Sequence, residues 1–336
     1  MNNTTTDALI QADDCFQNGG GKLRIIRMTV YISVTLASYF GNILILVSLK
    51  KFSDFLKGTP YILLGNLAVA DILLALGLSL QIFRIIVQPI EGEMFFCAIN
   101  MCIIGISITA SGFLLMFISV DRFCAIVFPM KHLIRSTKVR RRRIKLACVW
   151  FASASLICVM IFYNFIPSEY SICDHCDTAP FGIALALAVF MTLQFIMNIV
   201  MCLIVIWSLK SNTMCKEMYK KSLVKCALLI RVYIVFALCW SPYVVTIILM
   251  AVSTDKEKYA EARAYTIMPG LMNSSMNWII YSLSNQKLRD SFRNVLLCKN
   301  SRQMHVSNYN REKKKEPDPH PVHVTTPKEE NIYFLF

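Results

Sequence analysis

The chain has 336 residues and a formal net charge of +14, but only 17% of its residues are charged and 56% are hydrophobic. Soluble domains carry about 25% charged residues, so this composition excludes an ordinary soluble protein. Several apolar runs approach or exceed the roughly 20 residues that a helix needs to cross a bilayer, and they do not alternate as the strands of a membrane barrel do. We therefore expect an all-α membrane protein with polar ends.

Polar residues 1–24 come first and contain overlapping glycosylation sequons at Asn2 and Asn3. They lack the apolar core of a cleavable signal peptide, so the first span is expected to direct membrane insertion. Seven apolar runs follow within residues 25–283 and predict a seven-transmembrane helix bundle. The predicted spans are residues 25–49, 60–87, 94–127, 144–166, 181–209, 222–252 and 262–283.

Lysine and arginine crowd every second loop between these spans. Loops 50–60, 128–145 and 209–225 hold sixteen of them, whereas the N-terminal segment and the other three loops hold five. By the positive-inside rule, the N-terminus is extracellular and the C-terminus cytoplasmic. Because the basic residues lie in short loops beside apolar runs, they indicate topology and exclude a nucleic-acid groove. This orientation places four cysteines on the oxidising side, where disulfides form: Cys15, Cys97, Cys173 and Cys176.

Residues 284–298 follow the seventh span and have apolar residues at positions 288, 292, 295 and 296 beside a basic face. This spacing predicts a short amphipathic eighth helix on the inner leaflet of the membrane. Cys298 at its end is a candidate for palmitoylation. Residues 299–336 are rich in Lys, Pro and Glu and are predicted to form a disordered cytoplasmic tail.

Polar side chains inside the spans are informative because each needs a partner in a medium without water. Asp71 lies near the middle of the second span. Other spans contain Asn42, Ser107, Ser111, Asn273, Ser274 and Asn277. A buried carboxylate among hydroxyls and amides suits a protonated acid or a small hard cation such as Na⁺, but hydrogen bonds that merely join packed helices are an alternative. Asp121-Arg122 ends the uncharged stretch 97–120 and is either a functional site or a marker of the cytoplasmic side.

Several short motifs occur in successive spans and in a consistent order. They are Gly41-Asn42 in the first span, residues 66–71 (Asn-Leu-Ala-Val-Ala-Asp) in the second, Cys97 and Asp121-Arg122-Phe123 at the two ends of the third, Trp150 in the fourth, Phe236, Cys239, Trp240 and Pro242 in the sixth, and Asn273 to Tyr281 in the seventh. On these motifs the chain resembles a rhodopsin-like (class A) G-protein-coupled receptor over residues 25–298.

The resemblance implies roles for residues on the cytoplasmic side and in the middle of the bundle. Asp121 is implied to restrain Arg122 at rest, and Arg122 to face the G protein after its release. The full switch set is Asp121, Arg122, Phe123 and Tyr281. The residues that match the sodium pocket of the family are Asp71, Ser111, Asn273 and Asn277. An allosteric Na⁺ at Asp71 is thus the one metal expected, and no other cofactor is expected.

The resemblance also implies an extracellular ligand pocket. Trp240 matches the toggle residue beneath it, and the lining candidates are Tyr243, Asn100, Ile104, Ile108 and Ile267, with Gln81, Arg84, Thr246 and Arg263. Ile104 stands where amine receptors carry an aspartate, and Leu271 stands where opsins carry the retinal lysine, so neither a biogenic amine nor retinal is expected. Cys97 is implied to pair with a cysteine of the loop before the fifth span, and Cys173 is preferred over Cys176.

Several residues depart from the family pattern. Phe123 replaces a tyrosine, and Trp278 replaces the proline of the seventh span, so a weaker bend is expected there. The fifth span has Asn198 in place of its proline, and with Gly112 this residue breaks the usual packing around Phe236. Ser222 offers Arg122 no acid on the sixth span. Together these departures predict a loosely held resting state with basal signalling.

The sequence therefore predicts a multi-pass receptor of the plasma membrane with an extracellular N-terminus. It is expected to convert the binding of a peptide or small molecule into activation of a heterotrimeric G protein, with arrestin as a second partner and membrane lipid around it. An enzyme is not expected, because the spans hold no catalytic triad or metal-ligand cluster. The alternative is a multi-pass transporter or channel, which would show a polar path or inverted repeats.

Overall fold

A computed structural model of the chain describes residues 20–54, 56, 58–87, 93–128, 139–165, 181–211, 216–253 and 259–298. The sequons at Asn2 and Asn3, the cysteines at 173 and 176, and the tail 299–336 lie outside the described residues. The side chain of Arg122 also lies outside them, although its backbone belongs to a helix.

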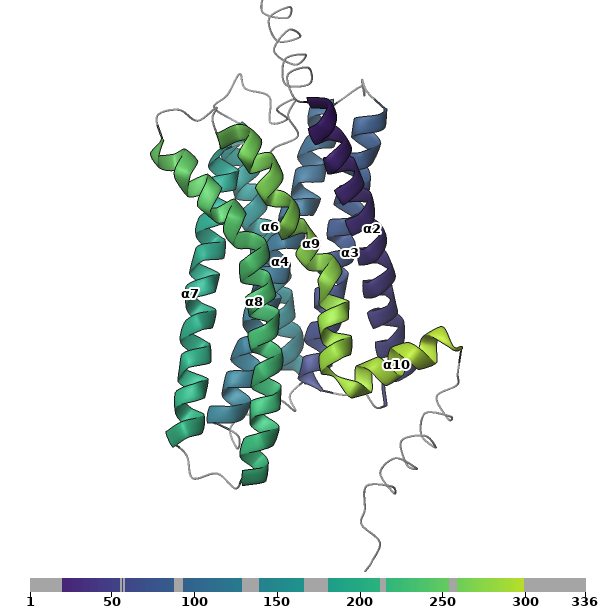
Figure 1. Cartoon of the computed structure of the whole chain (residues 1–336), viewed down its shortest axis with the longest axis vertical. Coiled ribbons are helices and arrows are strands. Elements are labelled where there is room, and N and C mark those ends of the chain that lie inside the picture. Colours follow the sequence, from purple (N-terminus) through teal and green to yellow (C-terminus); the bar gives the residue numbers. More distant parts are fainter. Residues whose placement is uncertain are drawn as a thin grey trace, which may run out of the picture.

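The described residues form eight helices and no strand. Their bounds are α2 Gly20–Lys51, α3 Thr59–Ile86, α4 Glu93–Val127, α6 Val139–Phe165, α7 Phe181–Ser211, α8 Lys216–Val252, α9 Ala260–Ser284 and α10 Gln286–Leu296. The first seven run along the long axis of the molecule, and α10 lies across one end, against α2 and α9 (Figure 1). The predicted seven-helix bundle with a short eighth helix is confirmed.

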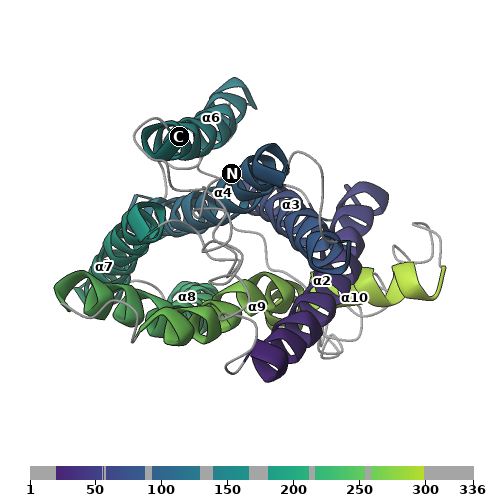
Figure 2. The ribbon, with the colours of Figure 1, turned by 90° about the horizontal axis from the view of Figure 1, so that it is seen from above.

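The bundle is a ring with one helix outside it. Seen from above, α2, α3, α4, α7, α8 and α9 follow one another around the ring, and α6 lies outside against α4 (Figure 2). Within the described residues, five helices are long and apolar enough to cross a membrane: Ile25–Lys51, Thr59–Ile86, Phe96–Ala125, Phe181–Ser208 and Arg231–Val252. Helices α6 and α9 fall outside that criterion but pack in the same bundle.

Large apolar side chains cover the outer face of this bundle. Phe151 of α6 is 77% exposed, Trp207 of α7 is 70% exposed and Leu238 of α8 is 67% exposed. A soluble protein would not leave so many apolar side chains in water, because their transfer into an apolar medium is favourable. The outer face is therefore suited to lipid.

Two helices begin earlier than predicted on the cytoplasmic side. Residues 139–143 were predicted to be loop, but they form the first turns of α6, and residues 216–221 form the first turns of α8. The prediction ended each span where the charges begin. Lysine and arginine are good helix formers, however, and a helix can continue from the hydrocarbon into water without losing its backbone hydrogen bonds.

The amphipathic helix α10 turns its apolar face partly toward the bundle. Asn285 caps it by accepting a hydrogen bond from the backbone N–H of Leu288 at 3.3 Å. Leu288 and Phe292 are buried, whereas Leu296 is 58% exposed. Contact with α2 and α9 therefore covers the first part of the apolar face, and the exposed remainder is free to contact lipid. The position of this helix on the inner leaflet stays a prediction.

Trp278 packs where the family proline was expected. Its indole lies against the backbone of Gly41, where an added Cβ would overlap the ring, and edge-on to Phe40 with the ring centroids 5.6 Å apart. Small residues permit such close approach between membrane helices. Helix α9 also contains Pro269, which removes a backbone hydrogen-bond donor at another level of the same helix.

We predict that Gly41→Ala destabilises the protein. The new methyl group must displace the Trp278 indole, and such overpacking costs about 1–3 kcal/mol. The measurement is the thermal unfolding temperature of the purified protein in detergent. Gly65→Ala is the control, because its Cβ would lie 3.2 Å from the flexible tip of Leu49. Equal unfolding temperatures for the two variants would contradict the packing assigned to Trp278.

Candidate functional site

Asp71 of α3 is the centre of a buried polar cluster. Its side chain is fully buried, and Asn277 of α9 donates a hydrogen bond to its carboxylate at 2.9 Å. The Ser111 hydroxyl of α4 donates to the other carboxylate oxygen at 3.4 Å, and Ser274 of α9 also hydrogen-bonds Asp71. Three helices are therefore joined through one carboxylate.

Asn42 extends this cluster to α2. Its amide nitrogen donates to the Ser38 carbonyl at 3.0 Å and to the Ser274 carbonyl at 3.4 Å. Ser107, weighed as a member of the cluster from sequence, donates to the Ile103 carbonyl of its own helix at 2.6 Å. The hydrogen bonds therefore bring Asn42 and Ser274 into the cluster and direct Ser107 elsewhere.

Asn273 precedes Ser274 in the sequence, and its side chain is buried, with 4% of its surface exposed. The structure shows two further buried oxygen atoms, Asn42 Oδ1 and Asn277 Oδ1, which accept no hydrogen bond from the residues it describes. Carboxylate, hydroxyl and amide oxygens are the ligand types that a small hard cation takes. The donor set around Asp71 therefore fits a Na⁺ ion.

A cavity lies on the extracellular side of this cluster. It has a volume of about 100 Å³, and its described lining comes from seven helices: α2, α3, α4, α6, α7, α8 and α9. Its described lining is Tyr31, Leu78, Gln81, Arg84, Cys97, Asn100, Met101, Ile104, Gly105, Ile108, Ile157, Ile161, Ile183, Leu187, Tyr243, Ile267 and Leu271. The lining includes every predicted ligand-pocket residue of the second and third spans, together with Tyr243 and Ile267.

Three residues that the sequence predicted to line the ligand pocket are absent from the described lining of this cavity. Trp240, Thr246 and Arg263 are buried but are not among the described residues that line the cavity. The aliphatic lining from α6 and α7 was missed altogether, as at Ile157 and Ile183. An isoleucine that lines a cavity has no sequence signal that separates it from one that fills the core.

An aromatic series leads from the cavity into the bundle. Tyr243 lines the cavity and packs edge-on to Trp240 at 6.1 Å between ring centroids. Trp240 lies 6.4 Å from Phe236, and Phe236 packs edge-on to Phe195 of α7 at 5.5 Å. Trp240, the predicted toggle residue, is thus not in the described cavity lining but one aromatic ring away from it.

The space beside Gly112 on α4 is filled by a glutamine of α7. An added Cβ at Gly112 would lie 2.6 Å from the Gln194 side-chain oxygen, so the amide of Gln194 occupies the space that glycine leaves. Asn198, one turn further along α7, is buried at 4% exposure. At this point α7 therefore places a polar side chain against the backbone of α4.

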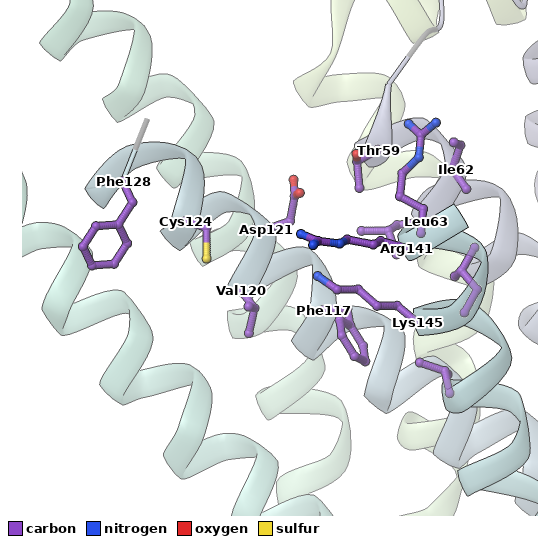
Figure 3. A pocket seen from close by; sticks show the side chains of 13 residues that line it. Thr59, Ile62, Leu63, Phe117, Val120, Asp121, Cys124, Phe128, Arg141 and Lys145 are labelled. Carbon is purple, nitrogen blue, oxygen red and sulfur yellow. The ribbon is translucent and has the colours of Figure 1, made fainter. Parts of the chain in front are cut away.

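The predicted switch lies at the cytoplasmic end of α4. Asp121 is partly buried and lines a cavity of about 450 Å³ between α3, α4 and α6 (Figure 3). Tyr281 is not at this surface but in the hydrophobic core, at 7% exposure. Since the Arg122 side chain is outside the described residues, its pairing with Asp121 stays a prediction.

Comparison with known proteins identifies the family. The family model described as "7 transmembrane receptor (rhodopsin family)" matches residues 41–281. The chain belongs to this family. Its members are non-enzymatic receptors that signal through G proteins, so this chain is a multi-pass membrane receptor, and the transporter or channel alternative is excluded.

The relatives of this receptor include two kinds of named receptor. Somatostatin receptor type 5 of Bos taurus is 29% identical over 289 residues, which cover 82% of this chain and 77% of the relative. Melanocortin receptor 5 of Rattus norvegicus is 26% identical over 295 residues, covering 81% and 85%. Somatostatin receptor type 3 of Homo sapiens is 27% identical over 283 residues, covering 80% and 67%.

Only one cysteine of the disulfide in this receptor lies within the described residues. Cys97, at the extracellular end of α4, is disulfide-bonded, and its partner lies outside the described residues. The pairing with Cys173 rather than Cys176 therefore stays a prediction. Cys298 is exposed just after α10 and is a free thiol, and its palmitoylation also stays a prediction.

A hydrogen bond that the sequence did not predict joins α8 to α4. The Tyr233 hydroxyl donates to the Leu115 carbonyl at 2.5 Å and accepts from the Ser119 hydroxyl at 2.5 Å. This neutral contact lies between the Asp71 cluster and Asp121 along α4. It joins the two helices on the side where Ser222 offers no acid for an ionic contact.

We predict that Tyr233→Phe raises basal signalling by about two- to tenfold. The change removes the hydroxyl but keeps the ring, and a net hydrogen bond contributes about 0.5–1.5 kcal/mol to the closed arrangement. The measurement is nucleotide exchange on a G protein without added ligand, at matched surface expression. Tyr39→Phe is the control, because the Tyr39 hydroxyl bonds Ser79 at 3.4 Å between α2 and α3. If both variants signal alike, Tyr233 does not restrain α8.

Proposed function

We propose that the receptor binds part of an extracellular peptide in the cavity beside Tyr243 and transmits this binding to a heterotrimeric G protein through α8. The observation that carries this proposal is the aromatic series in which Tyr243 contacts Trp240 and Trp240 contacts Phe236. A ligand that displaces the Tyr243 ring must move its neighbours, because packed aromatic side chains have little free volume.

The movement is a shift between two arrangements of the helices. Pro242 lies within α8, immediately before Tyr243, and interrupts the backbone hydrogen bonds at the point where the helix can bend. When α8 swings outward, the bond from Tyr233 to Leu115 breaks and the cytoplasmic end of α4 opens. A ligand and a G protein that both favour this open arrangement strengthen each other's binding.

The cavity supports a ligand with one polar and one apolar group. Its small volume accommodates a side chain or a chain end, while the remainder of a peptide lies outside. At the polar end, the Asn100 side-chain N–H donates to the Gln81 side-chain oxygen at 2.6 Å, and Arg84 adds a buried cation. Asn100 Oδ1 accepts no hydrogen bond from any described residue, so it is available to a donor on the ligand.

A peptide is favoured over a small molecule by the relatives, which are named as somatostatin and melanocortin receptors. The aliphatic walls of the cavity, which include Ile104, Ile108 and Ile267, suit an apolar side chain next to the polar group. The arrestin that the family implies stays a prediction, because it would bind through the cytoplasmic surface near Arg122.

The Asp71 cluster is proposed as a sodium site. Asp71, Ser111 and Ser274 would hold the ion, with Asn277 Oδ1 as a further oxygen ligand. A bound Na⁺ supplies positive charge that compensates the buried carboxylate. Since this cluster exists together with the closed contact from Tyr233 to Leu115, an ion that binds it favours the resting arrangement by linkage.

We predict that this receptor activates a G protein without added ligand. The hydrogen bonds that hold α8 to α4 through Tyr233 are neutral, so a fraction of the molecules opens spontaneously. The measurement is the second-messenger level in transfected cells across a panel of chimeric G proteins. Arg122→Ala is expected to abolish the basal signal. A wild-type signal no higher than that of this variant would contradict the proposal.

A ligand screen on the same cells separates the cavity from the switch. Peptides of the somatostatin and melanocortin classes are the first to apply, beside unrelated peptides. An agonist of the cavity loses potency in Asn100→Ala, whereas basal signalling stays unchanged there because Asn100 is remote from the cytoplasmic end. An agonist whose potency is equal in wild type and Asn100→Ala binds elsewhere.

We predict that replacing Na⁺ by choline raises basal nucleotide exchange about two- to tenfold, because the ion stabilises the resting arrangement. Asp71→Asn removes the charge that holds the ion and is expected to make exchange independent of Na⁺. Ser107→Ala is the control and keeps the dependence, since the Ser107 hydroxyl bonds the Ile103 carbonyl. Equal Na⁺ dependence in wild type and Asp71→Asn would rule out this site.

A further inference from the structure

A second cavity lies at the opposite end of the bundle from the extracellular one. It has a volume of about 450 Å³ and opens between α3, α4 and α6 at the cytoplasmic end (Figure 3). Its described lining comprises Thr59, Ile62, Leu63, Phe117, Val120, Asp121, Cys124, Phe128, Arg141, Arg142, Lys145, Leu146 and Val149. A volume of this size lies within the range of about 300–1,000 Å³ typical of small-molecule sites.

The helix packing explains why the cavity exists. Helices α3 and α6 both pack against α4, and α6 stands outside the ring (Figure 2). The Trp150 indole N–H donates to the Asn66 side-chain oxygen at 3.1 Å and joins α6 to α3 further into the membrane. Below that bond, the two helices leave space between Leu63 and Leu146.

The cavity has an apolar part and a cationic part. Ile62, Leu63 and Val149 lie toward the bond from Trp150 to Asn66 and form an aliphatic wall, with Leu63 and Val149 buried and Ile62 exposed at 37%. Arg141, Arg142 and Lys145 stand in the first two turns of α6, where the sequence places the boundary between hydrocarbon and cytoplasm. Three cations and one carboxylate, that of Asp121, are thus among the described residues that line the cavity.

The cationic side chains are directed into the cavity. Arg141 and Lys145 extend from α6 toward α4, where Asp121 lies (Figure 3). The Nε of Arg142 is buried and has no hydrogen-bond partner among the described residues. A buried guanidinium nitrogen without a partner is costly, and an oxyanion would satisfy it. Backbone N–H groups at the start of α6 add to the same positive potential.

We propose that this cavity is a binding site for one anionic phospholipid of the inner leaflet. Its phosphate would be held by Arg141, Arg142 and Lys145, and one acyl chain would lie along Ile62, Leu63 and Val149. Charge complementarity selects an anion, and the aliphatic wall at membrane depth selects an amphiphile over a free phosphate. Because Asp121 lines the same cavity, the bound headgroup lies beside the predicted switch.

The test is native mass spectrometry of the purified full-length receptor titrated with single lipids. Phosphatidylserine is expected to bind with higher affinity than phosphatidylcholine, and Arg141→Gln with Lys145→Gln is expected to weaken phosphatidylserine binding about thirtyfold, since two membrane-surface cations are removed. The matched control is Arg289→Gln with Arg293→Gln, which removes two exposed cations of α10. It lies on the same membrane face and outside the described lining of the cavity.

Two further variants distinguish lipid binding inside the cavity from general attraction of lipid to a charged surface. Arg141→Lys keeps the charge and is expected to keep most of the binding. Cys124→Phe fills the cavity without changing any charge and is expected to weaken binding about tenfold or more, because the acyl chain loses its contact area. Unchanged phosphatidylserine binding in Cys124→Phe, or an equal loss in the α10 control, would overturn the proposal and leave only general surface attraction.

Competition by inorganic phosphate distinguishes the two sources of the anion. Millimolar phosphate is expected not to displace phosphatidylserine, since it lacks the apolar part. Complete displacement would overturn the assignment to a phospholipid. The thermal unfolding temperature of each variant confirms that it is folded, and Arg141 and Lys145 are exposed, so their replacement does not open the core.

Discussion

The structure depends on one buried carboxylate. Asp71 has no exposed surface, and in a membrane no solvent replaces a lost partner, so the residues around it are held in place. Asn277 and Ser111 donate to it from two other helices, and Asn42 adds α2 through the Ser274 carbonyl. Four of the seven spans are therefore fixed to one another by hydrogen bonds near the middle of the membrane. Any change of conformation must either keep these bonds or exchange them together.

Helix α8 is attached to the bundle in a different way. It packs along α7 and α9, and its contacts in the described residues include the aromatic packing of Trp240 and Phe236 and the hydrogen bonds of the Tyr233 hydroxyl with α4. Aromatic packing tolerates small rotations at modest cost, and one neutral hydrogen bond contributes little. With Pro242 inside the helix, α8 is the element that can move while the part fixed by Asp71 stays in place. This difference in bonding supports the proposed shift between two arrangements of the helices.

The sequence predicted what depends on pattern and missed what depends on register between helices. Apolar length and the distribution of lysine and arginine were enough for the spans, and the mid-span position of Asp71 was enough to mark its cluster. Nothing in the sequence pointed to Tyr233 as a partner of Leu115, because a tyrosine on an apolar helix usually only packs. The contact of Gly41 with Trp278 was also hidden, since it joins residues on the first and last spans. The same limit applies to the ends of α6 and α8, where charge marks the membrane boundary but does not end a helix.

The basic residues in the first turns of α6 can have two roles at once, in membrane topology and in the cavity beside Asp121. Arginine and lysine on the cytoplasmic side orient the protein during insertion, and that requirement concerns only their number and side. Here Arg141 and Lys145 also face a cavity that contains Asp121, so their charges act on the residue next to Arg122. A carboxylate at the edge of the hydrocarbon responds strongly to nearby charge, because the effective dielectric there is lower than in water. Asp121 therefore shares the cavity with the cations of α6, and the proposed lipid phosphate would compete with its carboxylate for their charges.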